Sequence, residues 1–93
     1  MTHRTLDYTK DFLKELRTLP PKHFKQVVSK VLALTDEPFP ADAKLLQGHA
    51  DLWRVDSGEY RIVYTATNAR VEIIIAGKRN DDEVYRKLAR KLL

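Results

Sequence analysis

Residues 52–77, LWRVDSGEYRIVYTATNARVEIIIAG, decide the fold, because apolar side chains recur at every second position over most of this stretch. Such alternation is typical of β-strands that bury one face. Two short breaks in the pattern, around Ser57-Gly58 and Asn68-Ala69, indicate tight turns. The stretch therefore predicts an antiparallel meander of three strands, at Leu52–Val55, Tyr60–Thr67 and Arg70–Gly77.

The first turn predicts that two arginines lie side by side on the sheet. A two-residue turn flanked by Asp56 and Glu59 places Arg54 directly opposite Arg61. Like charges in opposed positions destabilise a sheet. Two interpretations remain open at this point. In the first, the two side chains extend into solvent or are neutralised by the two flanking carboxylates. In the second, they form a site for an anion such as phosphate, which arginine binds bidentately.

For the second hairpin we expect Thr67 to lie opposite Arg70. Together with the first hairpin, this pairing assigns the side chains of the meander to two faces of the sheet. The apolar face, which we expect to pack against helices, comprises Trp53, Val55, Tyr60, Ile62, Tyr64, Ile73 and Ile75. The mixed face comprises Arg54, Arg61, Val63, Thr65, Glu72, Ile74 and Ala76. Strict alternation also puts Lys78 on the mixed face, although the way the strand ends decides whether Lys78 or Arg79 points toward the arginines.

Helical periodicity replaces the alternation in the N-terminal half of the chain. After a short strand at His3–Tyr8, we expect Thr9 to cap a helix that ends at Pro20-Pro21. A second apolar stripe at helical spacing follows and closes at Asp36. Two helices joined by so short a connection are predicted to form an antiparallel hairpin.

The remaining segments complete the predicted topology. Residues 38–50 indicate a loop with at most one turn of helix, and Asn80 is expected to cap a final helix. The order β-α-α-β-β-β-α predicts an α+β fold, in which a small antiparallel sheet carries the helical hairpin on one face, followed by a C-terminal helix.

Composition narrows the class of protein. With 93 residues and 10.8 kDa, we expect a single domain over residues 1–93. The chain has no apolar run long enough for a membrane span, no secretory signal and no cysteine, so a cytoplasmic protein is expected. The net charge of +4 is weak evidence for an anionic partner. The three histidines of the chain do not have the spacing of metal ligands, and the sequence contains no glycine-rich phosphate loop.

The second half of the chain resembles the RelE branch of the RelE/ParE toxin superfamily. The resemblance lies in KLLQG at residues 44–48, YRIVY at residues 60–64, and GKR at residues 77–79 followed by EVY at residues 83–85. The most discriminating part is GKR with a tyrosine six residues after its arginine. The resemblance implies a RelE-like fold and a toxin of a type II toxin–antitoxin pair. It further implies cleavage of mRNA in the ribosomal A site, with neither metal nor cofactor.

The resemblance also assigns roles to individual residues. The catalytic arginines of the family fall on Arg61 and Arg79, its catalytic tyrosine falls on Tyr85, and a basic strand residue falls on Arg54. The family commonly has a second lysine two residues before this last position, where the chain has Leu52. The departure implies a slower enzyme, or one that uses Lys44, His49 or Lys78 instead. The residues expected to contact RNA are Lys44, His49, Lys78 and Arg86.

Two other functions remain open on sequence alone. One is a ParE-like toxin that inhibits DNA gyrase and cuts nothing, which would need neither Arg79 nor Tyr85. The other is a catalytically inactive relative that binds an antitoxin, for which Leu52 is the best argument. For the nuclease, the expected partners are the ribosome with its mRNA and a cognate antitoxin that covers the arginines with an acidic or amphipathic segment. No membrane partner is expected, and the free toxin is predicted to be a monomer.

Overall fold

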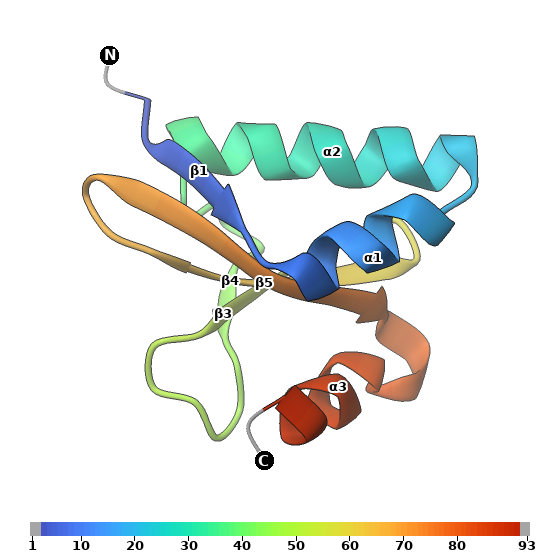
Figure 1. The fold of residues 1–93 in the computed structure, drawn as a ribbon. Helices are drawn as coiled ribbons and strands as arrows, with labels where there is room; N and C mark the ends of the chain where they lie inside the picture. The colour runs from blue at the N-terminus through green and yellow to red at the C-terminus, as the bar shows by residue number, and fades with distance from the viewer. Residues whose placement is uncertain (1–2, 92–93) are drawn as a thin grey trace.

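The computed structural model describes residues 3–91, which form one sheet flanked by helices on both sides (Figure 1). In chain order the elements are β1 (Thr5–Tyr8), α1 (Lys10–Thr18), α2 (Pro21–Asp36), β2 (Lys44–Leu45), β3 (Trp53–Ser57), β4 (Tyr60–Ala66), β5 (Arg70–Lys78), the 3₁₀ turn η1 (Arg79–Asp81) and α3 (Glu83–Lys91). The predicted α+β class and the predicted order of the principal elements are confirmed. No helix in this described range is long and apolar enough to cross a membrane.

The sheet is mixed, with strand order β1-β5-β4-β3-β2. β2 to β5 pair antiparallel, whereas β1 pairs parallel with β5. A wholly antiparallel sheet was therefore the wrong expectation for the first strand. Parallel neighbours need a long connection that returns the chain to the same end of the sheet. The helices α1 and α2 lie within that connection, and β1 pairs with the free edge of β5, the last strand of the meander.

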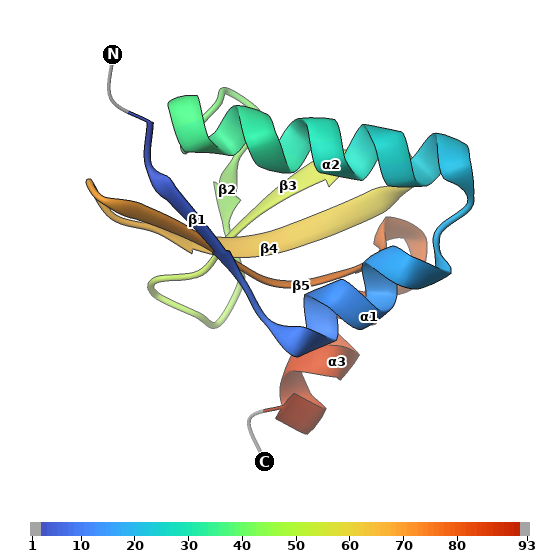
Figure 2. The same ribbon diagram turned by 45° about the horizontal axis from the view of Figure 1, so that its top comes forward.

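The helical hairpin covers one face of the sheet, as the sequence predicts (Figure 2). Thr9 caps α1, since its side-chain oxygen accepts a hydrogen bond from the Phe12 amide, and Pro21 is the first residue of α2. Apolar side chains from α1, α2 and the sheet form the hairpin core: Phe12, Leu19, Val27, Val31, Leu34, Val55, Tyr60, Ile62, Tyr64, Val71, Ile73 and Ala76. Burial of these side chains holds the helical hairpin on the sheet.

The segment between α2 and β3 contains a short strand that the sequence did not indicate. β2 has two residues, too few for any periodicity to be visible, and its pairing with β3 extends the sheet. The loop before it is attached to the core by Tyr64, whose hydroxyl donates a 2.6 Å hydrogen bond to the Pro38 carbonyl. Burial raises the pKa of this tyrosine to about 12, so it stays a neutral donor.

The second face of the sheet carries α3 on a smaller core, which we call the α3 core: Leu46, Val63, Ile75, Val84 and Leu88. Leu46 comes from the loop before β3, which lies on the same side of the sheet as α3 in Figure 1. The prediction that Asn80 caps this helix is wrong. Asn80 lies inside the 3₁₀ turn, Asp82 takes a left-handed conformation (φ 49°), and α3 begins at Glu83.

The first hairpin closes one residue later than predicted. Its turn residues are Gly58 and Glu59, and Gly58 has a positive φ of 59°, a conformation that favours glycine. Arg54 therefore lies opposite Val63, and Arg61 lies opposite Asp56. The predicted direct opposition of the two arginines is wrong, although both stay on the same face because the register moves by two positions.

The second hairpin starts in the predicted register and then shifts by one residue. Tyr64 lies opposite Ile73 as expected, but Val63 lies opposite Ile75, so that Ile74 is the extra residue of a β-bulge. Beyond the bulge the faces of β5 exchange. Ile75 joins the α3 core, and Ala76 joins the hairpin core, the reverse of the prediction. No local pattern indicates the bulge, because Ile73, Ile74 and Ile75 are chemically identical.

Candidate functional site: a basic cluster at the end of the hairpin

The side chain of Arg61 is largely enclosed. It is 15% exposed, and its Nε donates a 3.0 Å hydrogen bond to Oδ1 of Asp56 on the neighbouring strand. This contact follows from the observed register, in which the two residues are directly opposed. Since only Nε is used, the two Nη groups of the guanidinium have no hydrogen bond to the side chains and backbone that the structure describes, and they remain available to an anion.

Arg79 reaches the same carboxylate from the turn that follows the end of β5. Its Nη1 lies 3.7 Å from Oδ2 of Asp56, and its side chain is half exposed. The backbone amide of Arg79 donates to the Glu59 carbonyl at 3.1 Å, which fixes the start of the 3₁₀ turn beside the β3–β4 turn. Of the two carboxylates that the sequence offered to neutralise Arg54 and Arg61, Asp56 pairs with Arg61 and also with Arg79, but not with Arg54. Glu59 pairs with neither arginine, because its side chain lies 3.2 Å from His23.

Two further cations lie next to this pair. Lys44 on β2 is directly opposed to Arg54 on β3, and neither forms an ion pair with a side chain that the structure describes. Because side chains alternate along a strand, Arg54 projects from the same face of β3 as Asp56. We call Arg54, Arg61, Arg79 and Lys44 the basic site. It combines three arginines and a lysine, with one carboxylate between two of the arginines.

The β-bulge decides which cation of the Lys78-Arg79 pair joins the basic site. Lys78 lies opposite Tyr60, whose side chain belongs to the hairpin core, so strict alternation was wrong in placing Lys78 on the arginine face. Gly77, one residue earlier, lies opposite Arg61 instead. The chain then turns at η1 and brings Arg79 to Asp56.

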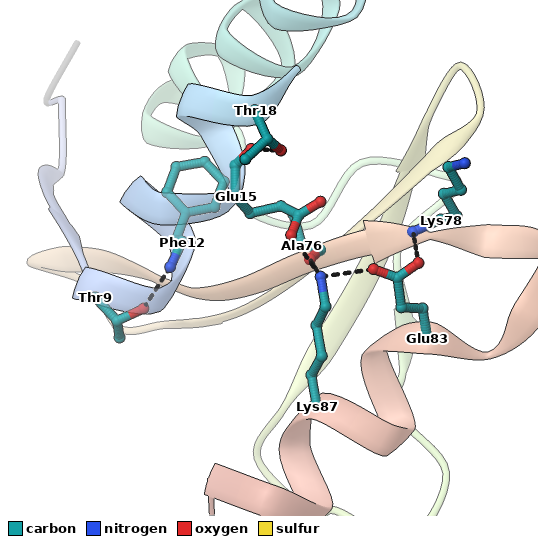
Figure 3. A network of polar contacts seen from close by, with 8 residues as sticks. All are labelled: Thr9, Phe12, Glu15, Thr18, Ala76, Lys78, Glu83 and Lys87. Carbon is teal, nitrogen blue, oxygen red and sulfur yellow. Dashed lines mark hydrogen bonds and ion pairs between the residues drawn. The ribbon is translucent and has the colours of Figure 1, made fainter.

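Glycine opposite Arg61 lets α3 approach the sheet closely. A Cβ at Gly77 would lie 3.2 Å from Cβ of Glu83, at the first residue of α3. The Glu83 carboxylate accepts a hydrogen bond from the Lys78 amide at 3.4 Å and pairs with Lys87 at 2.6 Å (Figure 3). The hydrogen bond from Lys87 holds the pKa of Glu83 below its usual value, despite partial burial.

Lys87 connects α3 to two other elements. Its ammonium donates to Glu15 of α1 at 2.5 Å and to the Ala76 carbonyl of β5 at 3.1 Å, in addition to Glu83 (Figure 3). Burial acts to lower the pKa of Lys87, but the hydrogen bonds to the two glutamates outweigh it and the pKa is raised. Among these contacts only the Glu83–Lys87 spacing of four residues could be inferred from the sequence.

Tyr85 packs against the α3 core. The side chain is partly buried there, together with Leu52 and Ile74. The packing role expected of a tyrosine on this helix is thus present, and its hydroxyl has no hydrogen-bond partner among the side chains and backbone that the structure describes. Since the core beneath it includes Val63, which lies opposite Arg54, Tyr85 covers the same face of the sheet as the basic site.

The other residues expected to contact RNA lie around the edge. His49 is half-buried in the loop before β3, where its amide donates to the Leu46 carbonyl at 3.1 Å. Arg86 is exposed on α3, and its charge contributes to the lowered pKa of Glu83. The structure therefore groups Arg54, Arg61, Arg79 and Lys44, and it separates Lys78 from them by face.

Comparison with known proteins gives one consistent group of relatives. No family model matches the chain. Over 92 residues the chain is 29% identical to the mRNA interferase toxin RelE of Escherichia coli K12, with 95% of this chain and 96% of the relative covered. The mRNA interferase RelE of Shigella flexneri matches with the same identity and coverage.

Solved structures agree with these sequence matches. A double mutant of the E. coli toxin RelE in the free state has a TM-score of 0.77 at 27% identity, covering 99% of this chain and 100% of that one. The RelE–RelB complex of Pyrococcus horikoshii OT3 has a TM-score of 0.74 at 25% identity, covering 86% and 99%. The intact E. coli RelBE toxin–antitoxin complex has a TM-score of 0.70 at 28% identity, covering 81% and 95%. The resemblance predicted from the sequence is confirmed.

Proposed function

We propose that this chain, which belongs to the RelE-like toxin superfamily, is the toxin of a toxin–antitoxin pair and acts as a ribosome-dependent mRNA endoribonuclease in the cytoplasm. Relatives named as mRNA interferases match nearly its whole length, and the solved relatives include complexes of RelE with RelB. The observation that carries the nuclease proposal is the convergence of Arg61 and Arg79 beside Arg54 and Lys44.

The proposed substrate group is a phosphodiester of mRNA. Attack by the 2′-hydroxyl on the adjacent phosphorus forms a cyclic phosphate and breaks the bond to the 5′-oxygen of the next nucleotide. The transition state carries extra negative charge on the phosphoryl oxygens, so preorganised cations are the groups that stabilise it. Arg61, with both Nη groups available, and Arg54, without an ion pair in the described residues, would bind these oxygens.

Two protons must move in this reaction. The 2′-hydroxyl loses one, and the leaving 5′-oxygen gains one. Arg79 would stabilise or protonate the leaving 5′-oxygen. Its half-exposed side chain lies 3.7 Å from Asp56, beyond hydrogen-bond length, and can shift toward a substrate. Tyr85 would assist the 2′-hydroxyl or stack on a base, since it covers the same face of the sheet. Lys44, His49, Lys78 and Arg86 would contact the RNA around the cleaved bond.

Dependence on the ribosome is physically reasonable for such a site. The basic site is open at the end of a hairpin and contains no histidine pair to act as acid and base. Much of the rate enhancement must then come from holding the RNA in an in-line geometry, and a bound ribosome can supply that geometry. The same exposed cations would be covered in the resting state by an acidic or amphipathic segment of a cognate antitoxin.

The experiment that tests this function compares two activities of the purified protein. Defined mRNA is incubated with the protein alone, with ribosomes, and in a complete translation system, and DNA gyrase supercoiling is measured in parallel. Cuts that require ribosomes, with gyrase unaffected, support the nuclease. Inhibition of gyrase without RNA cleavage contradicts it and favours a ParE-like toxin, and the absence of both activities favours an inactive antitoxin-binding relative.

A further inference from the structure

We infer that Asp56 is a positioning residue that holds Arg61 and Arg79 in one arrangement ready for a phosphate. The inference rests on the proposed nuclease function and adds to it an acidic residue within a site otherwise made of cations. No role beyond charge neutralisation follows for Asp56 from the sequence, where it is one of two carboxylates flanking a turn.

The geometry of the carboxylate carries the inference. Its two oxygens face two different guanidinium groups: Oδ1 accepts from Arg61 Nε at 3.0 Å, and Oδ2 lies 3.7 Å from Arg79 Nη1. The three residues come from β3, β4 and the turn after β5. One carboxylate therefore determines the relative position of two side chains whose backbones belong to different elements.

The two contacts differ in a way that suits substrate binding. The bond to the enclosed Arg61 has hydrogen-bond length and uses only Nε, which orients the guanidinium and leaves its Nη edge for a phosphate. The contact to the half-exposed Arg79 is longer than a hydrogen bond, so it restrains the side chain electrostatically. A phosphate can draw Arg79 away from Asp56 while Arg61 stays fixed.

Charge explains why the carboxylate is needed in the free protein. Two guanidinium groups that converge repel each other, and Arg79 lies on a short 3₁₀ turn with solvent access. Without Asp56, Arg79 is expected to point away from Arg61, and its return on substrate binding would reduce the rate of the chemical step. The site would meanwhile gain one net positive charge, which strengthens the attraction of RNA.

The test compares Asp56→Asn, which is nearly isosteric, with Glu59→Gln as a matched control. The control makes the same charge change in the same hairpin, at a side chain that pairs with His23 instead of the arginines. Single-turnover cleavage on ribosomes is measured at several protein concentrations. For Asp56→Asn we expect a roughly 10- to 100-fold lower maximal rate, an unchanged or lower half-saturating concentration, and recovery of most of the rate in Asp56→Glu. The control should cleave like the wild type.

A readout without catalysis separates this inference from the proposed function. The Nε–Hε resonances of Arg61 and Arg79 in ¹⁵N-labelled protein are expected to shift in Asp56→Asn and to stay in place in Glu59→Gln. Unchanged arginine resonances, or full cleavage by Asp56→Asn, would overturn the positioning role. Should wild-type protein cut nothing, the nuclease proposal fails, while the resonances still decide the role of Asp56. If Asp56→Asn does not fold, Asp56→Glu carries the test, and cleavage as slow as that of Arg61→Ala would contradict the inference.

Discussion

Glu83 packs on Gly77 so closely that a Cβ on the glycine would lie 3.2 Å from Cβ of the glutamate. The glycine lies opposite Arg61, and the glutamate is the first residue of α3. This contact sets how near the helix that carries Tyr85 lies to the sheet that carries the arginines. The close approach of α3 to the sheet thus depends on glycine at this position, because a Cβ there would require Glu83 to shift by a few tenths of an ångström.

Replacing this glycine tests the dependence. Gly77→Ala is expected to displace the start of α3 and to lower the free energy of unfolding by about 1–2 kcal/mol, as overpacking does. Cleavage should fall as well, since the helix bears Tyr85. Urea unfolding measures the first effect and single-turnover cleavage the second. Glu83→Ala removes two of the three atoms that the new methyl would meet, so the double mutant should lose less than the sum of the single losses.

The ion pair between Glu83 and Lys87 predicts a pH-dependent stability. Because the folded pKa of Glu83 lies below its ordinary value of 4.5, the pair stabilises the fold above pH 4.5, and this stabilisation is lost as the pH falls through the folded pKa. For Lys87 the folded pKa lies above 10.5, so its contribution is present below pH 10.5 and is lost as the pH rises through the folded pKa.

Unfolding of Glu83→Gln across this pH range measures the effect. At neutral pH the variant should be less stable than the wild type by about 1 kcal/mol, the upper range for a pair at this degree of exposure. The difference should shrink on acidification below pH 4.5, where the wild-type carboxylate is progressively protonated. A difference that stays constant down to pH 2 would show that the carboxylate charge contributes nothing.

Replacing Leu52 with lysine is expected to lower the stability of the fold and to raise the rate of cleavage. The side chain of Leu52 is partly buried against the α3 core, and the residue directly precedes β3, two residues before Arg54. Leu52→Lys should therefore cost about 1 kcal/mol of stability while its ammonium extends to the basic site and raises the cleavage rate. Leu45→Lys is the control, because Leu45 is 52% exposed and should tolerate the change in both measurements. Slower cleavage by a folded Leu52→Lys variant would contradict the prediction that the added ammonium raises the cleavage rate.

Tyr85→Phe separates the two roles open to the tyrosine. The ring is partly buried in the α3 core, and its hydroxyl has no hydrogen-bond partner in the described part of the chain, so the variant should unfold like the wild type. If the hydroxyl takes part in proton transfer, cleavage should fall by about 100-fold. We expect this fall. Cleavage at the wild-type rate would instead assign the ring to base stacking or to packing alone.

Much of the fold follows from the sequence, because each of its patterns has a physical cause that acts locally. The period of two in the meander, the cap at Thr9 and the break at Pro20-Pro21 all reappear in the structure. Arg61 and Arg79 also belong to one cluster, as the resemblance implied. These features depend on a few neighbouring residues and are therefore visible without the tertiary structure.

The features that the sequence did not predict depend on choices between nearly equal alternatives. The turn at Gly58-Glu59 and the bulge at Ile74 each move a register without any change in composition, and together they pair Arg61 with Asp56 and turn Lys78 to the opposite face. The contact between Lys87 and Glu15 joins residues 72 positions apart. No local periodicity can indicate such contacts, because they arise only when the packed elements meet.

The central claim is that the arginines around Asp56 cleave RNA, and primer extension on a defined mRNA in a purified translation system tests it most directly. Wild type, Arg61→Ala and Arg79→Ala are compared with Arg70→Ala as a control. Arg70 is an exposed arginine that pairs with Asp7 of β1, which is the edge strand farthest from β2. We predict ribosome-dependent cuts by the wild type and by the control, and a loss of about 100-fold or more in each of the other two variants. Cuts of wild-type intensity by folded Arg61→Ala and Arg79→Ala would contradict the account.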